Sequence, residues 1–404
     1  MRYIGVMLAA SVMLLTSCTA KSYEKSGRDY RRASPMPQTS YNAQHIIPKE
    51  RDGGFVKAMW ISYIDLAPML ADGTEESFRS SFSKACGNIS DLGCNTVFVH
   101  VRAFGDALYD SQFFPPSQMA GEFDALDMMC EIAHEHGLKL HAWINPLRLQ
   151  TADVLSDLGG YKTSQWYLQD TGQVSAAPYD DHLWLDPAFP EVRELIADGA
   201  AEIVVNYPVD GIHYDDYFYP TTDEAFDAQC YEEMSQGESL DDWRRSNIDE
   251  LCRAIYSAVK AADSDVCVSI SPQGNIENNH DIMYADVEKW CSEVGYCDII
   301  IPQIYFGYDN STKPFTETLR EWEDICSGDD VRLVIGLGAY KIGVEDEFTE
   351  NEGIIAQQIE DCADHGGVAL YSYSSFFGGN VDTARVETEK QMVASALQKI
   401  GDEC

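Results

Sequence analysis

From residue 55 onward, short apolar runs with strand character alternate with amphipathic helical segments. Eight such runs occur, at residues 56–62, 96–102, 139–145, 211–215, 266–271, 298–304, 331–337 and 368–373. Most of them are almost continuously apolar, which is typical of parallel strands buried on both faces. Between them lie helical patterns such as residues 123–135, where Leu126, Met129 and Ala133 share one face.

Eight strand-then-helix units over about 350 residues predict an α/β protein with a (β/α)8 TIM barrel, a fold of about 250 residues before insertions. A doubly wound open sheet is the alternative, but it requires a glycine-rich phosphate loop, and the chain has neither a G-x-G-x-x-G nor a Walker motif. The extra length lies after strands three and four, at residues 146–190 and 217–243. We expect both connections to lie over the carboxyl end of the barrel.

The composition excludes several classes of protein. Hydrophobic residues make up 45% of the 404 residues, which is too many for a disordered chain. Lys and Arg number 28 against 67 Asp and Glu, so the formal net charge is −39. Binding to nucleic acid or to an anionic membrane surface needs clustered basic residues, so neither is expected. Nothing in the sequence indicates a protein partner.

The first residues have the pattern of an export signal. Residues 1–17 carry Arg2, then an apolar stretch, then small residues, which is the layout of a signal peptide. The segment Leu15-Thr16-Ser17-Cys18 resembles the lipobox of bacterial lipoproteins, which implies acylation of Cys18 and a lipid anchor. An ordinary cleaved signal is the alternative.

The regions after this signal are predicted as a flexible tether at residues 18–49 and one barrel domain at residues 50–400. The residues that follow Cys18 are not rich in acids, so we expect a protein anchored in the bacterial cell envelope, at the outer membrane and on its periplasmic face. Eleven cysteines remain after Cys18, with no C-x-x-C motif. We interpret most of them, including Cys130, Cys252, Cys267 and Cys362, as small buried hydrophobic residues.

Polar and aromatic residues end several predicted strands. Because the carboxyl ends of barrel strands meet at one mouth, we expect these side chains to gather there and contact a substrate. Aromatic faces that stack on sugar rings, together with amides, carboxylates and an arginine that bind hydroxyl groups, indicate a carbohydrate site. The candidate substrate-binding residues are Arg102, Asp106, Trp143, Asn145, His213, Tyr217, Gln303, Tyr305 and Tyr373.

The pair Asp215-Asp216 follows the fourth predicted strand. Carboxylates at the end of a buried strand must be either compensated by partners or used in chemistry. Alternation along the strand predicts that Asp215, like His213, points into the barrel. Glycoside hydrolysis commonly uses two carboxyl groups, so we predict that Asp215 and Asp216 are catalytic. The alternative is that one of them caps the next loop or pairs with Arg102.

A metal site is the rival chemistry. His100, His141 and His213 lie on three successive predicted strands, and such a cluster can hold zinc. The first strand has no His-x-His pair, and the chain has no His-Glu-x-x-His motif. We therefore expect no catalytic metal and no cofactor. No G-x-S-x-G motif supports a serine nucleophile.

Five stretches of the sequence resemble glycosyl-hydrolase-like family 10. They are FVKAMWISYID (55–65), VHVRAFGDALYDS (99–111), LHAWINPLR (140–148), LWLDPAFPEVR (183–193) and VDGIHYDDYFYP (209–220), and the resemblance covers roughly residues 50–395. It implies a TIM-barrel glycoside hydrolase, often an exported lipoprotein, with members that digest peptide-stripped peptidoglycan strands. The implied substrate is therefore a cell-envelope glycan, most of all peptidoglycan.

The strand-four pattern is also similar to that of the α-amylase-type barrels, whose final Asp is the nucleophile. This similarity favours Asp215 as nucleophile or base, with Asp216 as its acid partner or electrostatic support. A chitinase-type barrel has a Glu where this chain has Tyr217, so the proton donor is open between Asp216 and Glu277. Two alternatives are a non-catalytic glycan-binding lipoprotein and a hydrolase of an imported dietary or host polysaccharide.

Overall fold

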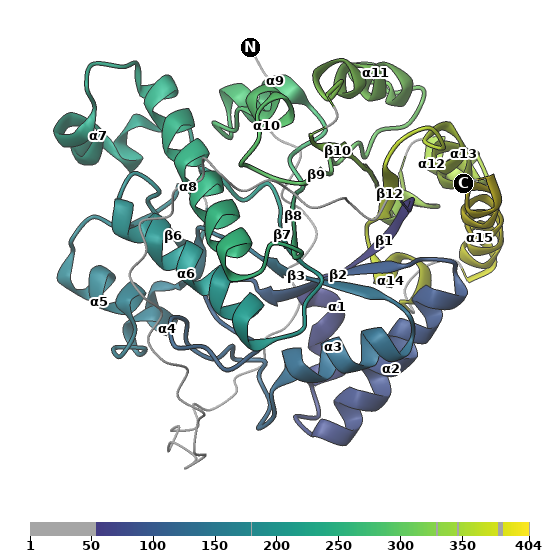
Figure 1. Cartoon of the computed structure of the whole chain (residues 1–404), viewed down its shortest axis with the longest axis horizontal. Helices are drawn as coiled ribbons and strands as arrows, with labels where there is room; N and C mark the ends of the chain where they lie inside the picture. The colour runs from purple at the N-terminus through teal and green to yellow at the C-terminus, as the bar shows by residue number, and fades with distance from the viewer. Residues whose placement is uncertain (1–53, 179, 329, 346, 379–382, 404) are drawn as a thin grey trace. The chain divides into compact units, whose positions relative to one another are not determined.

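A sheet of nine parallel strands forms the centre of the computed structural model, which describes residues 54–403 except 179, 329, 346 and 379–382 (Figure 1). The strands are β1 (Val56–Ile61), β2 (Thr96–Arg102), β3 (Lys139–Ile144), β7 (Gly211–Tyr214), β8 (Cys267–Ile270), β9 (Ile299–Ile300), β10 (Arg332–Leu333), β11 (Ile335–Leu337) and β12 (Gly367–Leu370).

The sheet curls into a barrel. Its strand order is β10-β9-β8-β7-β3-β2-β1-β12-β11, and every strand pair is parallel. Only Val334 separates β10 from β11, so these two short strands occupy one position and nine strands fill eight barrel positions. The eight strands lie where the sequence predicts them, which confirms the α/β TIM barrel.

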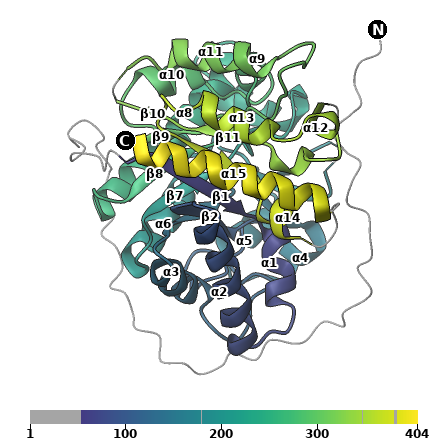
Figure 2. The ribbon, with the colours of Figure 1, turned by 90° about the vertical axis from the view of Figure 1, so that its right-hand side faces the viewer.

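Helices surround the barrel on the outside. They are α1 (Tyr63–Leu70), α2 (Glu75–Asp91), α3 (Ala125–Glu135), α6 (Pro190–Asn206), α8 (Leu240–Ala262), α9 (Ile276–Asp281), α10 (Val287–Ser292), α11 (Phe315–Ile325), α12 (Glu347–Glu350), α13 (Ile354–Asp361), α14 (Tyr373–Phe377) and α15 (Thr383–Glu403). The long helix α15 runs along the outer side beside α13 and α14 (Figure 2).

Large apolar side chains fill the inside of the barrel. Trp60, Phe98, Trp143 and Ile301 pack there as one buried cluster. Gly211 is the first residue of β7, and the ring of His141 occupies the space where a side chain would lie. A Cβ atom at Gly211 would be 2.4 Å from His141 Nδ1. The interior below the mouth is therefore a packed core and not a pore.

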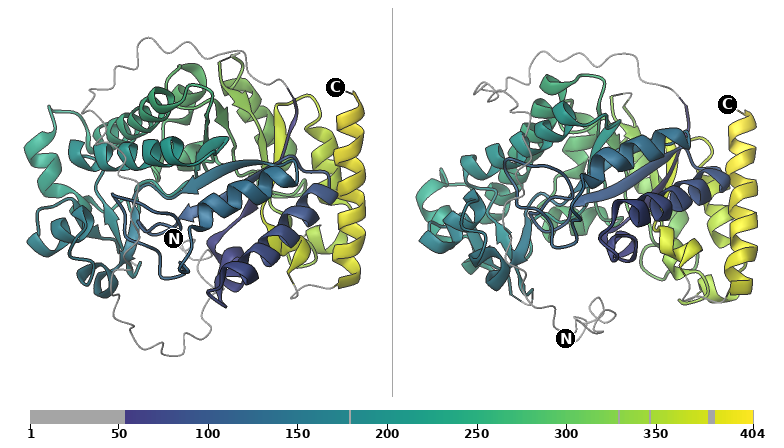
Figure 3. Two further views of the ribbon diagram at one scale, coloured as in Figure 1. Left: turned by 60° about the horizontal axis from the view of Figure 1, so that its bottom comes forward. Right: turned by 90° about the horizontal axis from the view of Figure 1, so that it is seen from below.

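Two connections carry extra structure at one side of the barrel. The connection after β3 contains β4 (Arg148–Thr151), α4 (Ala152–Ser156), α5 (Lys162–Gln169), β5 (Val174–Ala176) and β6 (His182–Leu185), and its three strands form a small antiparallel sheet. The connection after β7 contains η2 (Glu224–Phe226) and α7 (Ala228–Met234). In both views of Figure 3 this teal region and the yellow helix α15 lie at opposite sides of the barrel.

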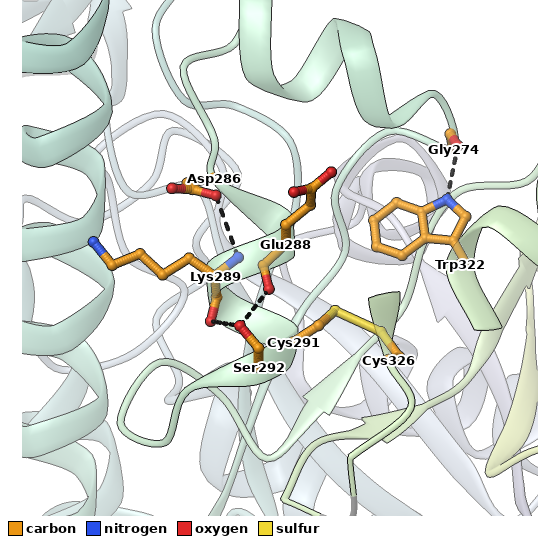
Figure 4. Close-up of a disulfide and its surroundings, with 8 residues drawn as sticks. All are labelled: Gly274, Asp286, Glu288, Lys289, Cys291, Ser292, Trp322 and Cys326. Atoms are coloured by element: carbon orange, nitrogen blue, oxygen red, sulfur yellow. Dashed lines mark hydrogen bonds between the residues drawn. A yellow bond between two sulfur atoms is a disulfide. The ribbon is translucent and has the colours of Figure 1, made fainter. Parts of the chain in front are cut away.

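A disulfide bond joins Cys291 of α10 to Cys326 at the end of α11 (Figure 4). Beside it, the indole N–H of Trp322 donates a hydrogen bond of 2.8 Å to the carbonyl oxygen of Gly274. The sequence did not predict this pair. In contrast, Cys130, Cys252 and Cys362 are fully buried in the apolar core, which confirms their interpretation as small hydrophobic residues. Cys267, the first residue of β8, is only partly buried.

The predicted signal peptide, the predicted tether and Cys18 lie outside the described residues. Among the helices that the structure describes, none has the length and apolar character needed to cross a membrane.

Candidate active site

Strand β7 delivers alternate side chains to the inside of the barrel. His213 pairs in register with Trp143 of β3 and with Ser269 of β8, and its ring packs against Phe98 at 4.3 Å. Asp215 follows two residues later, just beyond the carboxyl end of the strand. Burial raises the pKa of Asp215 and Trp143 acts to lower it, so the two side chains lie close to each other. Asp215 therefore lies at the mouth, directly above the packed core.

His213 itself does not reach the mouth. Its Nε2 accepts a hydrogen bond of 2.9 Å from Trp60 Nε1, and its Nδ1 lies 2.9 Å from Ser269 Oγ. Nδ1 must therefore carry the proton that it donates to the serine, and burial lowers the pKa of the imidazole well below its ordinary value. The prediction that His213 contacts the substrate is corrected, because both ring nitrogens already have partners within the core.

Asp215 is a buried carboxylate without a cation. Its side chain is 5% exposed, and Oδ1 has no hydrogen-bond partner among the described residues. Burial, and next the charge of Asp216, raise the pKa of Asp215 well above its ordinary value. Trp143 favours the ionised form slightly, but its indole N–H completes no hydrogen bond with it. Asp215 is therefore held in a site that favours its protonated form.

Asp216 lies next to it in a more polar setting and is half-buried. Gln303 Nε2 donates a hydrogen bond of 3.2 Å to Asp216 Oδ1 and another of 3.0 Å to the carbonyl oxygen of Ser271. Burial raises the pKa of Asp216, but hydrogen bonds from Gln303 and Gln273 act against this rise. The two carboxyl groups thus have different environments, and the one at Asp216 favours the ionised form more.

Two groups of aromatic rings lie near the pair. On the insertion side, Tyr63 and Phe104 have ring centroids 5.0 Å apart, and the guanidinium of Arg148 lies 5.1 Å from the Phe104 centroid and 5.0 Å from that of Tyr217. We call Tyr63, Phe104, Arg148 and Tyr217 the insertion wall. The placement of Tyr217 agrees with its prediction as a mouth residue.

The other side is a tyrosine wall formed by Tyr305, Tyr340 and Tyr371. Their ring centroids lie 5.8–6.1 Å apart. Burial raises the pKa of Tyr305 well above its ordinary value, and neighbouring phenols, Asp216 and Asp215 raise it further. Burial and several neighbours, among them Asp215, also raise the pKa of Tyr371. Both carboxylates therefore lie within electrostatic reach of this wall. Tyr305 and Gln303 lie beside Asp216, and their contact with a substrate stays a prediction.

Trp143, Asn145 and Asp106 support the mouth from below. The Trp143 ring stacks on His100 with centroids 3.8 Å apart. Asn145 Nδ2 donates a hydrogen bond of 2.9 Å to the carbonyl oxygen of Ala103, and Asp106 Oδ1 accepts one of 3.0 Å from the backbone N–H of Phe104. All three predicted side chains are buried, and the last two shape the loop that presents Phe104.

Besides His213, two predicted substrate-binding residues, Arg102 and Tyr373, lie away from the mouth. The register between β2 and β3 shifts between His100 and Arg102, so Arg102 turns to the outer face. Its guanidinium lies 4.0 Å from the Phe114 centroid and against α6, where a Cβ atom at Gly199 would meet it. Tyr373 begins helix α14 and accepts a hydrogen bond of 3.0 Å from Asn88 of α2. Both predictions of substrate contact are therefore corrected.

Glu277, the other candidate proton donor, lies on α9. It is exposed and forms an ion pair of 2.7 Å with Lys313, whose hydrogen bond lowers the pKa of Glu277. An exposed carboxylate that is stabilised in its ionised form is poorly suited to donate a proton at neutral pH. Among the acids that the sequence offered for catalysis, Asp215 and Asp216 therefore lie at the mouth without an ion-pair partner among the described residues.

The three histidines considered as metal ligands lie in the barrel core. Burial lowers the pKa of His100 to about 3 and that of His141 to about 4. Phe98 contacts His141 edge-on, at 5.2 Å between centroids. Within the part of the chain that the structure describes, no group of three or more His, Cys, Asp or Glu side chains is arranged to hold a metal ion.

A cavity of about 280 Å³ lies elsewhere, in the connection between β8 and β9. It is lined by Ile276, Glu277, His280, Asp281, Asp286, Val287 and Glu288. None of the mouth residues lines this cavity, and its carboxylates include exposed and ion-paired ones. We therefore place the site at the barrel mouth, where the carboxylates are withdrawn from water without a cation.

Sequence reasoning missed several residues of the mouth. Gln273 follows β8 at the same distance from the strand as Gln303 follows β9, and the two are bridged in the structure. Tyr371 shares the strand parity of Ala369, which faces the barrel interior. Strand parity could not identify Phe104 or Arg148 as residues of the mouth. Phe104 lies in the loop after β2, and Arg148 lies on β4 of the small antiparallel sheet.

Comparisons with known proteins identify similar chains. The family model described as Glycosyl hydrolase-like 10 matches residues 56–351. The chain is 28% identical over 391 residues to the glycosyl hydrolase DigH of Escherichia coli, covering 86% of both chains. It is 31% identical over 317 residues to the glycosyl hydrolase YngK of Bacillus subtilis, covering 71% of this chain and 61% of that one.

Solved structures also resemble the fold. The glycoside hydrolase domain of PgaB (BpsB) from Bordetella bronchiseptica superposes with a TM-score of 0.56 at 11% identity, covering 84% of this chain and 99% of that one. The catalytic domain of a β-amylase from Paenibacillus polymyxa gives a TM-score of 0.55 at 10% identity, over 85% and 98% of the two chains. At these identities the likeness describes the barrel alone.

Proposed function

Because the chain belongs to the glycosyl hydrolase-like 10 family, we propose that it hydrolyses the glycosidic bonds of a glycan at the Asp215–Asp216 pair. The observation that carries this proposal is the pair of adjacent carboxyl groups at the barrel mouth, one buried and one half-buried, with two aromatic walls beside them and no cation among the described residues. Glycoside hydrolysis needs two carboxyl groups of unequal acidity, and rings that can stack on sugars would hold the substrate beside them.

The environments of the two carboxyl groups support a division of roles. Asp215, with the more strongly raised pKa, keeps its proton and donates it to the leaving glycosidic oxygen. Asp216, which accepts hydrogen bonds from Gln303 and Gln273, stays ionised and attacks the anomeric carbon or deprotonates the attacking water. Cleavage then consumes one water molecule and releases a new reducing end. This assignment reverses the one favoured by the similarity to α-amylase-type barrels.

Peptide-free peptidoglycan strands are the substrate that we propose. The support is the sequence resemblance, whose most specific stretch, residues 209–220, contains the two proposed catalytic residues. The proposed location is the bacterial cell envelope, with a lipid anchor at Cys18 and the barrel on the periplasmic face. The Cys291–Cys326 disulfide supports an exported protein, since disulfide bonds persist in oxidising compartments.

The test measures new reducing ends when full-length protein in detergent is incubated with peptide-free glycan strands. We expect cleavage by the parent protein and loss of cleavage in Asp215→Asn and Asp216→Asn. Glu277→Gln is the matched control, because it removes an exposed, ion-paired acid. Equal cleavage by Asp216→Asn and the parent would contradict the proposal. Dietary and host polysaccharides, assayed in parallel, test the alternative substrate class.

A non-catalytic glycan-binding protein is the second candidate. The observation that favours it is that Glu277, the other candidate proton donor from the sequence, is exposed and held in an ion pair with Lys313. Binding of glycan strands without any new reducing ends, under conditions where the protein is folded, would support this candidate over the hydrolase.

A further inference from the structure

The guanidinium of Arg148 lies at the mouth. Two of its three nitrogens have no hydrogen-bond partner among the described residues. Arg148 opens β4, four residues after the end of β3, and pairs with Trp184 of β6. Its guanidinium lies between the rings of Phe104 and Tyr217 at 5.1 and 5.0 Å from their centroids. Its position is therefore fixed by the small antiparallel sheet and by two rings of the insertion wall.

The partners of Arg148 leave two of its three nitrogens without an acceptor. Nη2 lies 3.3 Å from His182 Nδ1 and 3.5 Å from Asp180 Oδ1. Among the described residues, Nε and Nη1 have no hydrogen-bond partner, and Nε is enclosed. Asp180 is itself occupied, since it accepts hydrogen bonds of 3.0 Å from the His182 backbone, His182 Nδ1 and Trp184 Nε1.

Such an arginine is suited to bind an anion. A guanidinium group has five N–H donors in a planar fork that matches a carboxylate, and a charge-assisted pair of this kind is among the stronger polar contacts. An acidic substrate would need a cation at this site, because the chain has a net charge of −39 and the mouth contains two carboxyl groups. Without a local positive charge, an acidic substrate would be repelled.

We propose that Arg148 binds a carboxylate of the substrate and makes the site selective for glycans with acidic sugars. This inference rests on the proposed function and specifies its substrate class. In peptide-free peptidoglycan each muramic acid residue has a free lactyl carboxylate, whereas a stem peptide converts that carboxylate into a neutral amide. Arg148 would therefore distinguish stripped strands from strands that still carry peptides.

The experiment compares two forms of one glycan. Peptide-free strands are used either with free lactyl carboxylates or after conversion of these groups to primary amides, and binding to the full-length protein in detergent is measured by calorimetry. We expect the parent protein to bind the carboxylate form about tenfold more tightly than the amide form. Higher salt should reduce this preference, because it screens the charges.

Three variants identify the group responsible. Arg148→Met should lower the preference to near 1, and Arg148→Lys should give an intermediate value, because lysine keeps the charge without the planar fork. Arg79→Met, at an exposed ion pair on α2, is the matched control and should leave the preference unchanged. An equal loss of affinity for both forms in Arg148→Met would assign Arg148 a structural role and overturn the inference.

The two proposals fail in different ways. If the parent protein cleaves and binds both forms of the strand equally, the selectivity of Arg148 is wrong while the hydrolase stands. If it prefers the carboxylate form but releases no reducing ends, the hydrolase is wrong while the role of Arg148 stands. If it binds neither form, both proposals are wrong.

Discussion

The connection after β7 and the mouth of the barrel both bury charged side chains, but they treat them in opposite ways. Asp227 of the connection and Arg244 of helix α8 are fully buried and joined by hydrogen bonds of 2.9 and 2.5 Å. Arg244 also donates to the Tyr284 hydroxyl at 3.0 Å and to the Asp223 carbonyl oxygen at 2.8 Å. At the mouth, neither Asp215 nor Asp216 has a cation among the described residues.

The consequence of burying a charge depends on how many of its donors and acceptors have partners. Where every donor and acceptor has a partner, as at Arg244, the charge stabilises one arrangement of the chain and has no capacity left for a ligand. Where a carboxylate or a guanidinium has unused capacity, as at Asp215 and Arg148, the cost of burial is not offset within the protein. At the mouth, this unused capacity supports a functional site.

The largest effect should follow from neutralising the ionised carboxylate of the mouth. Asp216→Asn should lower the rate of glycan cleavage by roughly 10³-fold, because general acid–base groups contribute on the order of 10²–10⁴. The folded structure should persist, as judged by circular dichroism. A variant that keeps its fold and more than about a tenth of the parent rate would remove Asp216 from the chemistry.

Arg244→Met should act on stability instead. Breaking a buried ion pair leaves an uncompensated charge, which costs about 3–5 kcal/mol in the free energy of unfolding. Arg148→Met, which removes a partly exposed ion pair of 3.5 Å, should cost under about 1 kcal/mol. Urea unfolding of both variants measures the contrast. Equal losses would show that the two arginines do not differ in the way the structure indicates.

Asp215→Asn should stabilise the protein at neutral pH. The folded state raises the pKa of Asp215, so between its ordinary and raised values the folded state binds more protons than the unfolded state, and stability falls as the pH rises through this window. The amide removes this loss. We expect a melting temperature higher by roughly 1–3 °C at neutral pH and a flatter pH profile. A lower melting temperature at neutral pH would contradict the raised pKa.

The smallest effect concerns two neighbouring tyrosines. Tyr371→Ala should raise KM about fivefold with a smaller change in kcat, because a stacked ring contributes on the order of 1 kcal/mol to binding. Tyr373→Ala is the control, since Tyr373 faces α2 rather than the mouth. Equal effects of the two substitutions on KM would place the tyrosine wall outside the binding site.

The sequence was sufficient to predict the barrel and the strand that carries the acidic pair. Alternation of apolar runs with helical patterns locates the strands, and strand parity points Asp215 inward. Strand parity wrongly predicts that Arg102 and Tyr373 point to the mouth. The register shifts at Arg102, and Tyr373 already belongs to helix α14. These interruptions depend on packing between elements far apart in the chain, so no local pattern reports them.

The sequence also does not show whether a buried polar atom has a hydrogen-bond partner. His213 and Asp215 lie two residues apart on the same face, and both are polar residues in an apolar strand. Only the structure shows that Trp60 and Ser269 use both nitrogens of His213, while Asp215 Oδ1 has no such partner among the described residues. The partners come from strands that are distant in sequence, so spacing cannot predict them.

The bond between Cys291 and Cys326 spans 35 residues, and this stretch includes Gln303 and Tyr305. A protease that cut the backbone once anywhere inside it would produce two fragments that remain tied together. The severed ends could separate locally, yet β9 and the residues after it would stay tethered to their neighbours in the barrel. A single cut within this stretch would therefore leave one side of the site attached to the barrel.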